Sequence, residues 1–221
     1  MTETGNRRIK TGWTLLLLLV MGLFCGCVNL SELTQTGVEM TYYTLEYEPT
    51  AAAADKIDRV LKVNRFTAAP LFASKKIVYK QKDFQTGEYL YHQWHVAPTE
   101  SIASLLARDM SQSGLFAVVL DPAAATPAAF SVSGNLEVCL EDNTRRPWEA
   151  VLSLGILLTD ETEPDISKRV LMQKVYTATE PCARKNPRAT AEAMSRALQK
   201  ISMEIVRDVY GAIKERTRRS D

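Results

Sequence analysis

The chain has 221 residues, of which 46% are hydrophobic and 24% are charged. This length and balance suit one globular domain with a full core, and they exclude a disordered, collagen-like or coiled-coil chain. The 27 Lys and Arg against 26 Asp and Glu leave a formal charge of +1. The sequence therefore lacks the basic excess that a nucleic-acid partner would require.

Residues 1–26 are predicted to be a signal peptide. Arg7, Arg8 and Lys10 form a positive n-region, and residues 13–25 (WTLLLLLVMGLFC) form a short, Leu-rich apolar stretch. A membrane-spanning helix needs about 20 apolar residues, and no basic stop-transfer cluster follows this stretch. These features favour a leader over the alternative, a permanent transmembrane anchor.

Residues 23–27 (LFCGC) resemble a bacterial lipobox, in which small residues precede a Cys that receives a diacylglycerol. The resemblance implies that Cys27 becomes the first mature residue and carries thioether-linked diacylglycerol and an amide-linked acyl chain such as palmitate. Such acyl chains hold a protein on a membrane leaflet. Val28, where inner-membrane lipoproteins have Asp, implies sorting to the outer membrane. The alternative is a plain secretory signal with two incidental cysteines.

The mature chain divides into three predicted segments. Residues 27–40 are polar and lack periodicity, as expected of a tether. Residues 41–216 contain the periodic segments of one domain, and residues 217–221 form a short basic tail.

Short strands and a hairpin are predicted in the first half of the domain. Residues 41–47 and 59–66 are rich in β-branched, aromatic or alternating apolar residues. Residues 76–80 and 89–94 form the arms of a hairpin, joined by the Gly-containing loop 83–88.

A helix and three long strands follow. Ile102, Leu105, Leu106 and Met110 share one helical face, which predicts a helix over 98–113. We expect Thr99 to cap this helix and Gly114 to end it. Residues 116–120 form another apolar run. Residues 130–141 alternate, with apolar side chains at even positions, and 148–158 and 170–179 continue as strands of an antiparallel meander.

A long amphipathic helix closes the domain. Asn186 is its predicted cap and Pro187 its first residue, and apolar residues then recur on one face from Met194 to Ile213. The predicted fold class is α+β: a twisted, mainly antiparallel sheet with two amphipathic helices packed on one side.

The order of several motifs behind the lipobox resembles the ABC-type transport auxiliary lipoproteins, the family that accompanies MCE-domain lipid transporters. The motifs are 42–45 (YYTL), 65–66 with 69–72 (RF, APLF), 77–80 (IVYK), 89–94 (YLYHQW) and 113–116 (SGLF).

This resemblance implies a protein without catalytic activity or cofactor, fixed to the periplasmic face of the outer membrane. There it would dock an envelope-spanning MCE assembly, with a ring of identical copies as a further implication. Two alternatives remain open: a periplasmic lipid-binding carrier and an envelope-assembly scaffold unrelated to transport. Sheet faces closed by helices leave little room for an acyl chain, which disfavours the carrier.

Conventional catalytic and metal motifs are missing from the sequence. His92 and His95 are three apart on a predicted strand, so they point to opposite faces, and no Cys or carboxylate lies near in sequence to complete a tetrahedral site. No G-x-S-x-G elbow surrounds a Ser. We therefore predict no catalytic residue and no metal.

Two pairs of residues remain as candidates. Cys139, on the predicted polar face of its strand, and Cys182 either form a disulfide in an oxidising periplasm or stay free thiols. Tyr89 and Tyr91 belong to an aromatic group more typical of packing in a sheet. If these two tyrosines share an exposed face, they are the expected partner contacts.

Overall fold

The computed structural model describes residues 39–49 and 55–220. Met40–Asp221 form one compact unit, which is distinct from Met1–Glu39. The predicted signal peptide, Cys27 and the tether up to residue 38 lie outside the described residues.

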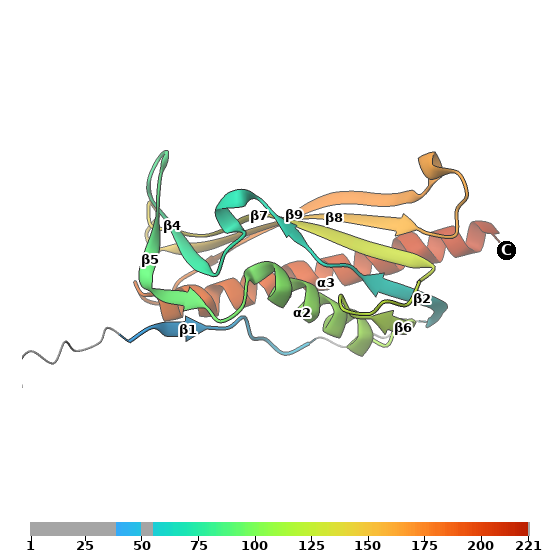
Figure 1. Ribbon diagram of the computed structural model, residues 1–221, viewed down its shortest axis with the longest axis horizontal. Helices are drawn as coiled ribbons and strands as arrows, with labels where there is room; N and C mark the ends of the chain where they lie inside the picture. The colour runs from blue at the N-terminus through green and yellow to red at the C-terminus, as the bar shows by residue number, and fades with distance from the viewer. Residues whose placement is uncertain (1–38, 50–54, 221) are drawn as a thin grey trace, which may run out of the picture. The chain divides into compact units, whose positions relative to one another are not determined.

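The described residues of the unit form one sheet and two α-helices (Figure 1). In chain order the elements are β1 Thr41–Tyr43, β2 Ile57–Val63, β3 Thr67–Ala68, η2 Pro70–Phe72, β4 Lys76–Lys82, β5 Gln85–Trp94, α2 Pro98–Gln112, β6 Phe116–Leu120, β7 Phe130–Asp142, β8 Glu149–Asp160, η3 Ile166–Lys168, β9 Val170–Pro181 and α3 Pro187–Ser220.

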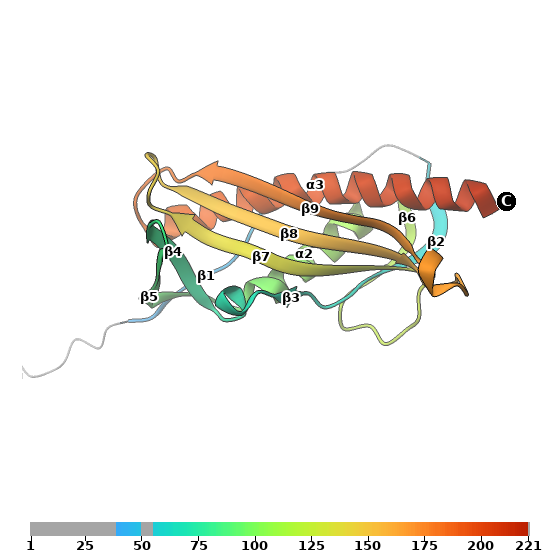
Figure 2. The ribbon, with the colours of Figure 1, turned by 90° about the horizontal axis from the view of Figure 1, so that it is seen from above.

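Three long strands, β7, β8 and β9, lie side by side in the sheet, with β9 at its edge (Figure 2). They pair antiparallel along nearly their whole length, with Phe130 opposite Asp160 at one end and Asp142 opposite Glu149 at the other. These pairings confirm the predicted meander. Their length follows from long runs that are rich in β-forming residues, and alternation of apolar residues gives β7 and β8 a face to bury.

The other edge of β7 carries three shorter strands in succession. β2 pairs with its start, β3 with its middle and β4 with its end, all of them parallel to β7. β6 then extends the sheet beyond β2, and β5 and β1 extend it beyond β4. The α+β class is confirmed, with a mixed sheet in which the longest pairings are antiparallel.

Both helices lie on the same side of the three long strands (Figure 1). α3 packs on β8 and β9, and α2 packs on β2, β6 and β7 and against α3. The core between them is formed by inward side chains such as Leu152 and Leu154 of β8 and Ile201 and Val209 of α3, all at most 2% exposed. Burial of both apolar faces explains why the helices share one side of the sheet.

The helix ends only partly follow the predicted caps. The Asn186 side chain accepts a hydrogen bond from the Ala189 amide (2.9 Å), and Gly114 has a φ of +73°, as expected. The predicted Thr99 cap is wrong, because Ala97 holds the N-cap position without a side-chain hydrogen bond and Thr99 lies within the first turn of α2. Residues 217–220, set apart in the sequence as a basic tail, continue α3.

A bulge in β7 reverses the predicted alternation halfway along the strand. Leu136 faces Leu154 and Val138 faces Ser153, so Glu137 is an extra residue on β7. The even positions are buried before the bulge, and Cys139 and Glu141 are buried after it. The expectation that Cys139 lies on a polar face is therefore wrong, because one inserted residue exchanges the two faces.

The N-terminal strands also differ from the prediction. The first strand ends at Tyr43, four residues early. The hairpin turn contains only Asp83 and Phe84, because Gln85 to Glu88 pair with β4. Neither α-helix in the described part of the chain combines the length and apolar character needed to cross a bilayer.

Candidate functional site

The face of the sheet opposite the helices is lined by polar side chains. Thr177 Oγ1 donates to Ser153 Oγ, and Ser153 Oγ donates to Glu137 Oε2, both at 3.1 Å. Asn64 similarly donates to Ser133 Oγ (3.1 Å). A groove of about 740 Å³ crosses this face. Its lining mixes polar and charged side chains, such as Asn135, Glu137 and Lys174, with apolar ones such as Leu157 and Val175.

A second groove, of about 880 Å³, lies beside α2. It is lined by residues of both charges, including Arg65, Glu100, Arg108 and Asp121. Arg108 is already held in place: its guanidinium lies 4.7 Å from the centre of the Tyr47 ring and donates to Asp109 Oδ1 (2.8 Å). This groove therefore presents balanced charge and no single strongly attractive group.

Asp109 is a buried carboxylate that joins three segments. It accepts hydrogen bonds from Tyr47 Oη (2.6 Å), which follows β1, and from Ser202 Oγ of α3, and Arg108 neutralises it. Burial, together with the adjacent carboxylate, raises the pKa of the Tyr47 phenol well above its usual range. These contacts fix the N-terminal segment to both helices.

Glu141 is a second buried carboxylate, and it joins the β4–β5 hairpin to α3. Tyr89 Oη donates to Glu141 Oε1 (2.8 Å), and Thr190 Oγ1 donates to the other oxygen. Burial and the Glu141 carboxylate raise the pKa of Tyr89. The alternation in the sequence predicted that Glu141 lies on the solvent face of β7. The bulge at Glu137 turns Glu141 inward, so this contact could not be predicted without the structure.

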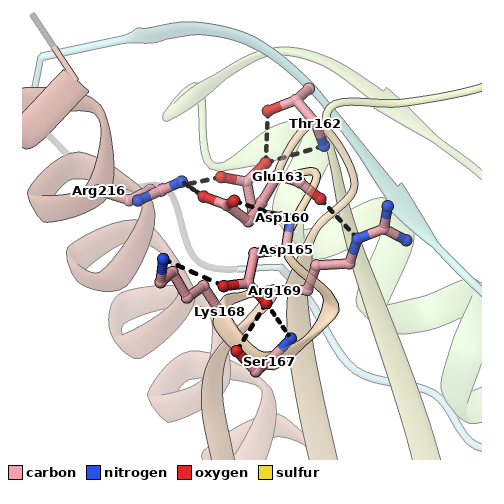
Figure 3. A network of polar contacts seen from close by, with 8 residues as sticks. All are labelled: Asp160, Thr162, Glu163, Asp165, Ser167, Lys168, Arg169 and Arg216. Atoms are coloured by element: carbon pink, nitrogen blue, oxygen red, sulfur yellow. Dashed lines mark hydrogen bonds and ion pairs between the residues drawn. The ribbon is translucent and has the colours of Figure 1, made fainter.

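A polar network fixes the β8–β9 loop to the end of α3 (Figure 3). Arg216 donates to Asp160 Oδ2 (2.8 Å) and to Glu163 Oε2 (2.6 Å), while Arg169 donates to the Glu163 carbonyl (2.7 Å). Burial opposes ionisation of Asp160, but hydrogen bonds from Thr162 and Arg216 outweigh it and lower the pKa of Asp160. The arrangement is a structural clamp.

The two histidines lie among tyrosines. His92 Nδ1 is 3.2 Å from Tyr43 Oη, whereas the exposed His95 meets the Tyr42 ring edge-on, with ring centroids 5.8 Å apart. In residues 39–49 and 55–220, no three His, Cys, Asp or Glu side chains gather to hold a metal ion.

The disulfide considered for Cys139 and Cys182 is not formed: both are buried free thiols. Cys139 faces Leu152 of β8, and Leu152 faces Ala178 of β9, so a whole strand separates β7 from β9. Two strand spacings are about 9.6 Å, beyond the roughly 6.8 Å that a disulfide tolerates between Cα atoms.

The two candidate tyrosines do not share an exposed face. Tyr89 is half-buried against Tyr79, with ring centroids 5.0 Å apart, whereas Tyr91 is 47% exposed. The pairing of β5 with β4 is interrupted between Glu88 and Gln93, and residues from His92 onward pair with β1. This irregularity breaks the i, i+2 relationship on which the expectation depended.

Three solved structures resemble this fold. Protein XCC0632 from Xanthomonas campestris is 18% identical with a TM-score of 0.72, and the match covers 80% of this chain and 99% of that one. An uncharacterized protein is 14% identical with a TM-score of 0.60, covering 77% and 99% of the two chains. The hypothetical protein CT253 from Chlamydia trachomatis is 12% identical with a TM-score of 0.51, covering 71% and 98%. At these identities they show the fold alone.

No curated protein matches the sequence significantly. A family model does match, over residues 43–206, from the last residue of β1 to the middle of α3. This range includes the buried carboxylates Asp109 and Glu141 and all three strands of the meander. The chain belongs to the family of ABC-type transport auxiliary lipoprotein components.

Proposed function

We propose that the protein is a non-catalytic lipoprotein of the outer membrane that holds the periplasmic end of an MCE-type ABC transport assembly at that membrane. The family match over residues 43–206 is the observation that carries this proposal, because it spans almost the whole folded unit. The lipobox-like LFCGC sequence supplies the attachment through Cys27.

The structure favours docking over lipid carriage. The helix-free face of the sheet carries mutually hydrogen-bonded Ser, Thr, Asn and Glu side chains, with the apolar Leu157 and Val175 between them. An acyl chain bound there would remove these polar side chains from water without offering them hydrogen bonds in return. Burying polar groups in this way costs free energy. A protein partner can instead exchange hydrogen bonds with such a face.

Tyr91 is our first candidate for a contact with that partner. It is exposed on β5 beside Leu90, which is 77% exposed, whereas Tyr89 is held by Glu141. Aromatic side chains are enriched where protein interfaces are buried. The proposal includes a ring of identical copies, which the family resemblance implies. Each partner assembly would then contact Tyr91 of several copies.

Co-purification tests the docking function. The tagged full-length lipoprotein is expressed with the MCE-domain protein, the permease and the ATPase from the same bacterium, and both protein and phospholipid in the eluate are quantified. Capture of the MCE protein without stoichiometric lipid is expected. One lipid per monomer without an MCE protein would instead support the carrier, and capture of neither would support a scaffold unrelated to transport.

Two variants sharpen that experiment. Tyr91→Ala should reduce capture of the MCE protein several-fold, whereas Met203→Ala, an equally exposed apolar site on α3, should leave it unchanged. Cys27→Ala should move the protein out of the outer-membrane fraction. Unchanged membrane recovery of the Cys27→Ala variant would contradict the lipid attachment.

A further inference from the structure

Phe84 is an exposed aromatic residue at the tip of the β4–β5 hairpin. Its side chain is fully exposed, and its φ of 62° lies in the left-handed region that normally favours Gly or Asn. The last paired residues of the hairpin are Lys82 and Gln85, so Phe84 extends beyond the sheet. A bulky apolar side chain at a strained turn in water suggests an external binding surface.

Two loops beside this hairpin concentrate positive charge. Residues 143–147 and 183–188 contain five basic and no acidic residues, all five exposed, which we call the basic end: Arg145, Arg146, Arg184, Lys185 and Arg188. The Cys182 amide donates to the Trp148 carbonyl (2.7 Å), which brings the two loops together. The chain as a whole has a net charge of +1, so this excess is local.

The hairpin belongs to the same end of the unit. The Asn143 amide donates to the Lys80 carbonyl (2.8 Å), and Lys80 lies only four residues before Phe84. Lys80 itself pairs with Asp83 (2.9 Å), and Arg188 pairs with Glu192 (3.1 Å). Among the described residues, Arg188 is the one cation of the basic end with a carboxylate partner, so the other four are available for a negatively charged surface.

The chain also enters the folded unit at this end. β1 pairs with the end of β5, and residues 42–47 face the first turns of α3 around Arg188 and Arg196 across a groove of about 400 Å³. Cys27 precedes Thr41 by 14 residues. Fourteen residues span at most about 50 Å, so the proposed acyl anchor at Cys27 would keep the start of β1 within about that distance of the membrane.

The opposite end of the unit has different chemistry. Its β8–β9 loop, which we call the acidic end, contains Asp160, Glu161, Glu163 and Asp165 and presents Ile166 to solvent. Arg216 pairs with Asp160 and Glu163, and Lys168 pairs with Asp165 (Figure 3). Because these carboxylates balance the neighbouring cations, this end attracts the anionic lipids of a bacterial leaflet less than the basic end does. The distribution of charge along the unit therefore distinguishes one membrane-compatible end from the other.

We propose that the basic end binds anionic phospholipid headgroups while the Phe84 ring enters the boundary between headgroups and acyl chains. Cations next to an exposed aromatic side chain are the combination that peripheral membrane contacts use. This second contact rests on the proposed lipid anchor and deepens it, because one acylated residue alone would not orient the domain. The contact would direct the acidic end and the open face of the sheet away from the bilayer.

A fluorescent probe on the lipidated full-length protein tests this contact. An environment-sensitive dye is attached to Phe84→Cys and, as a control, to Ile166→Cys at the acidic end; the native Cys139 and Cys182 are buried. The proteins are reconstituted into vesicles of phosphatidylethanolamine with phosphatidylglycerol, and into vesicles of phosphatidylcholine alone. The dye at position 84 should shift to the blue and be quenched by nitroxide lipids on the anionic vesicles, while the dye at 166 should not.

A charge variant tests the basic end separately. Arg145→Gln, Arg146→Gln, Arg184→Gln and Lys185→Gln together should reduce the quenching at position 84 by more than half. The control removes four cations from the other end: Lys56→Gln, Arg59→Gln, Arg218→Gln and Arg219→Gln. This control has the same net charge as the fourfold variant of the basic end. Its dye at position 84 should be quenched as strongly as in the parent protein.

The outcomes separate this inference from the proposed function. Vesicle-bound protein with equal quenching at 84 and 166 would overturn the inference and leave the lipid anchor intact. Protection of position 84 only after an MCE-domain protein is added would also overturn it, and would assign the hairpin tip to protein docking. Protein that does not float with vesicles at all would refute the lipid anchor and this contact with it.

Discussion

At the scale of single residues, Gly134 shows how closely the core is packed. A Cβ built at this position would lie 2.2 Å from the Phe66 ring, which is itself buried. The missing side chain lets Phe66 cover β7 at the point where β3 begins to pair with it. Any other residue would push the ring and the adjoining strand outward.

We therefore expect Gly134→Ala to lower the free energy of unfolding by about 1–3 kcal/mol, the usual cost of overpacking a core. Gly211→Ala is the matched control. Nothing lies within 4 Å of its added Cβ, and α3 continues through it. Ala at a helix interior stabilises by roughly 0.5–1 kcal/mol relative to Gly. Urea unfolding of both variants measures the difference, and equal midpoints would contradict this packing.

The two domain cysteines give a second prediction at this scale. Burial raises the pKa of the Cys139 thiol to about 12, and burial also raises the pKa of Cys182. Since the thiolate is the reactive form, neither residue should react with a thiol reagent at pH 8 in the folded protein. Two thiols should react after unfolding without reductant. A count of zero would show that Cys139 and Cys182 are oxidised.

At the scale of elements, the clamp at Arg216 joins the C-terminal part of α3 to the β8–β9 loop. Asp160 is 2% exposed, so its carboxylate depends on hydrogen bonds within the protein. Because Glu163 bonds the same guanidinium, one side chain connects both ends of the turn that starts the loop.

Arg216→Gln should lower the free energy of unfolding at pH 7 by about 1.5–3 kcal/mol, the value of a hydrogen bond to a charged group. The pKa of Asp160 is lower in the folded protein than in the unfolded chain. The contribution of the Asp160–Arg216 pair to the free energy of unfolding is therefore complete above about pH 4. It is lost as the pH falls through the pKa of Asp160 in the folded protein. The variant should consequently show a shallower loss of stability in acid.

The control for the clamp is Arg218→Gln, which removes a pair with the exposed Glu215. Such surface pairs contribute about 0–1 kcal/mol. Chemical denaturation between pH 3 and pH 7 compares the two variants. If both lose the same stability at every pH, the clamp does not depend on the ionised Asp160.

At the scale of the whole molecule, one core connects both helices with the long strands of the sheet. Leu106 of α2, Leu154 of β8 and Ile205 of α3 are each at most 1% exposed within it. Such shared burial couples the unfolding of the elements. Far-UV and near-UV circular dichroism melting curves of the mature protein should therefore coincide. Two separate transitions would show that the hairpin end unfolds on its own.

The sequence by itself determined the local features. Helical periodicity located α2 and α3 almost to the residue, alternation located the meander, and the Asn186 cap and Gly114 stop were recognisable from their residue types. These signals are reliable because they depend on neighbours within one or two turns of the chain. The order of motifs also indicated the family, without saying which surfaces would matter.

The tertiary structure decided everything that depends on distant pairing. The extra residue Glu137 buries Glu141 and Cys139, the edge of β7 is shared by three parallel strands, and the strand between Cys139 and Cys182 keeps them apart. The basic end likewise forms from two loops that are about forty residues apart in the sequence. Register and strand order arise from the packing of the whole core, which no local pattern records.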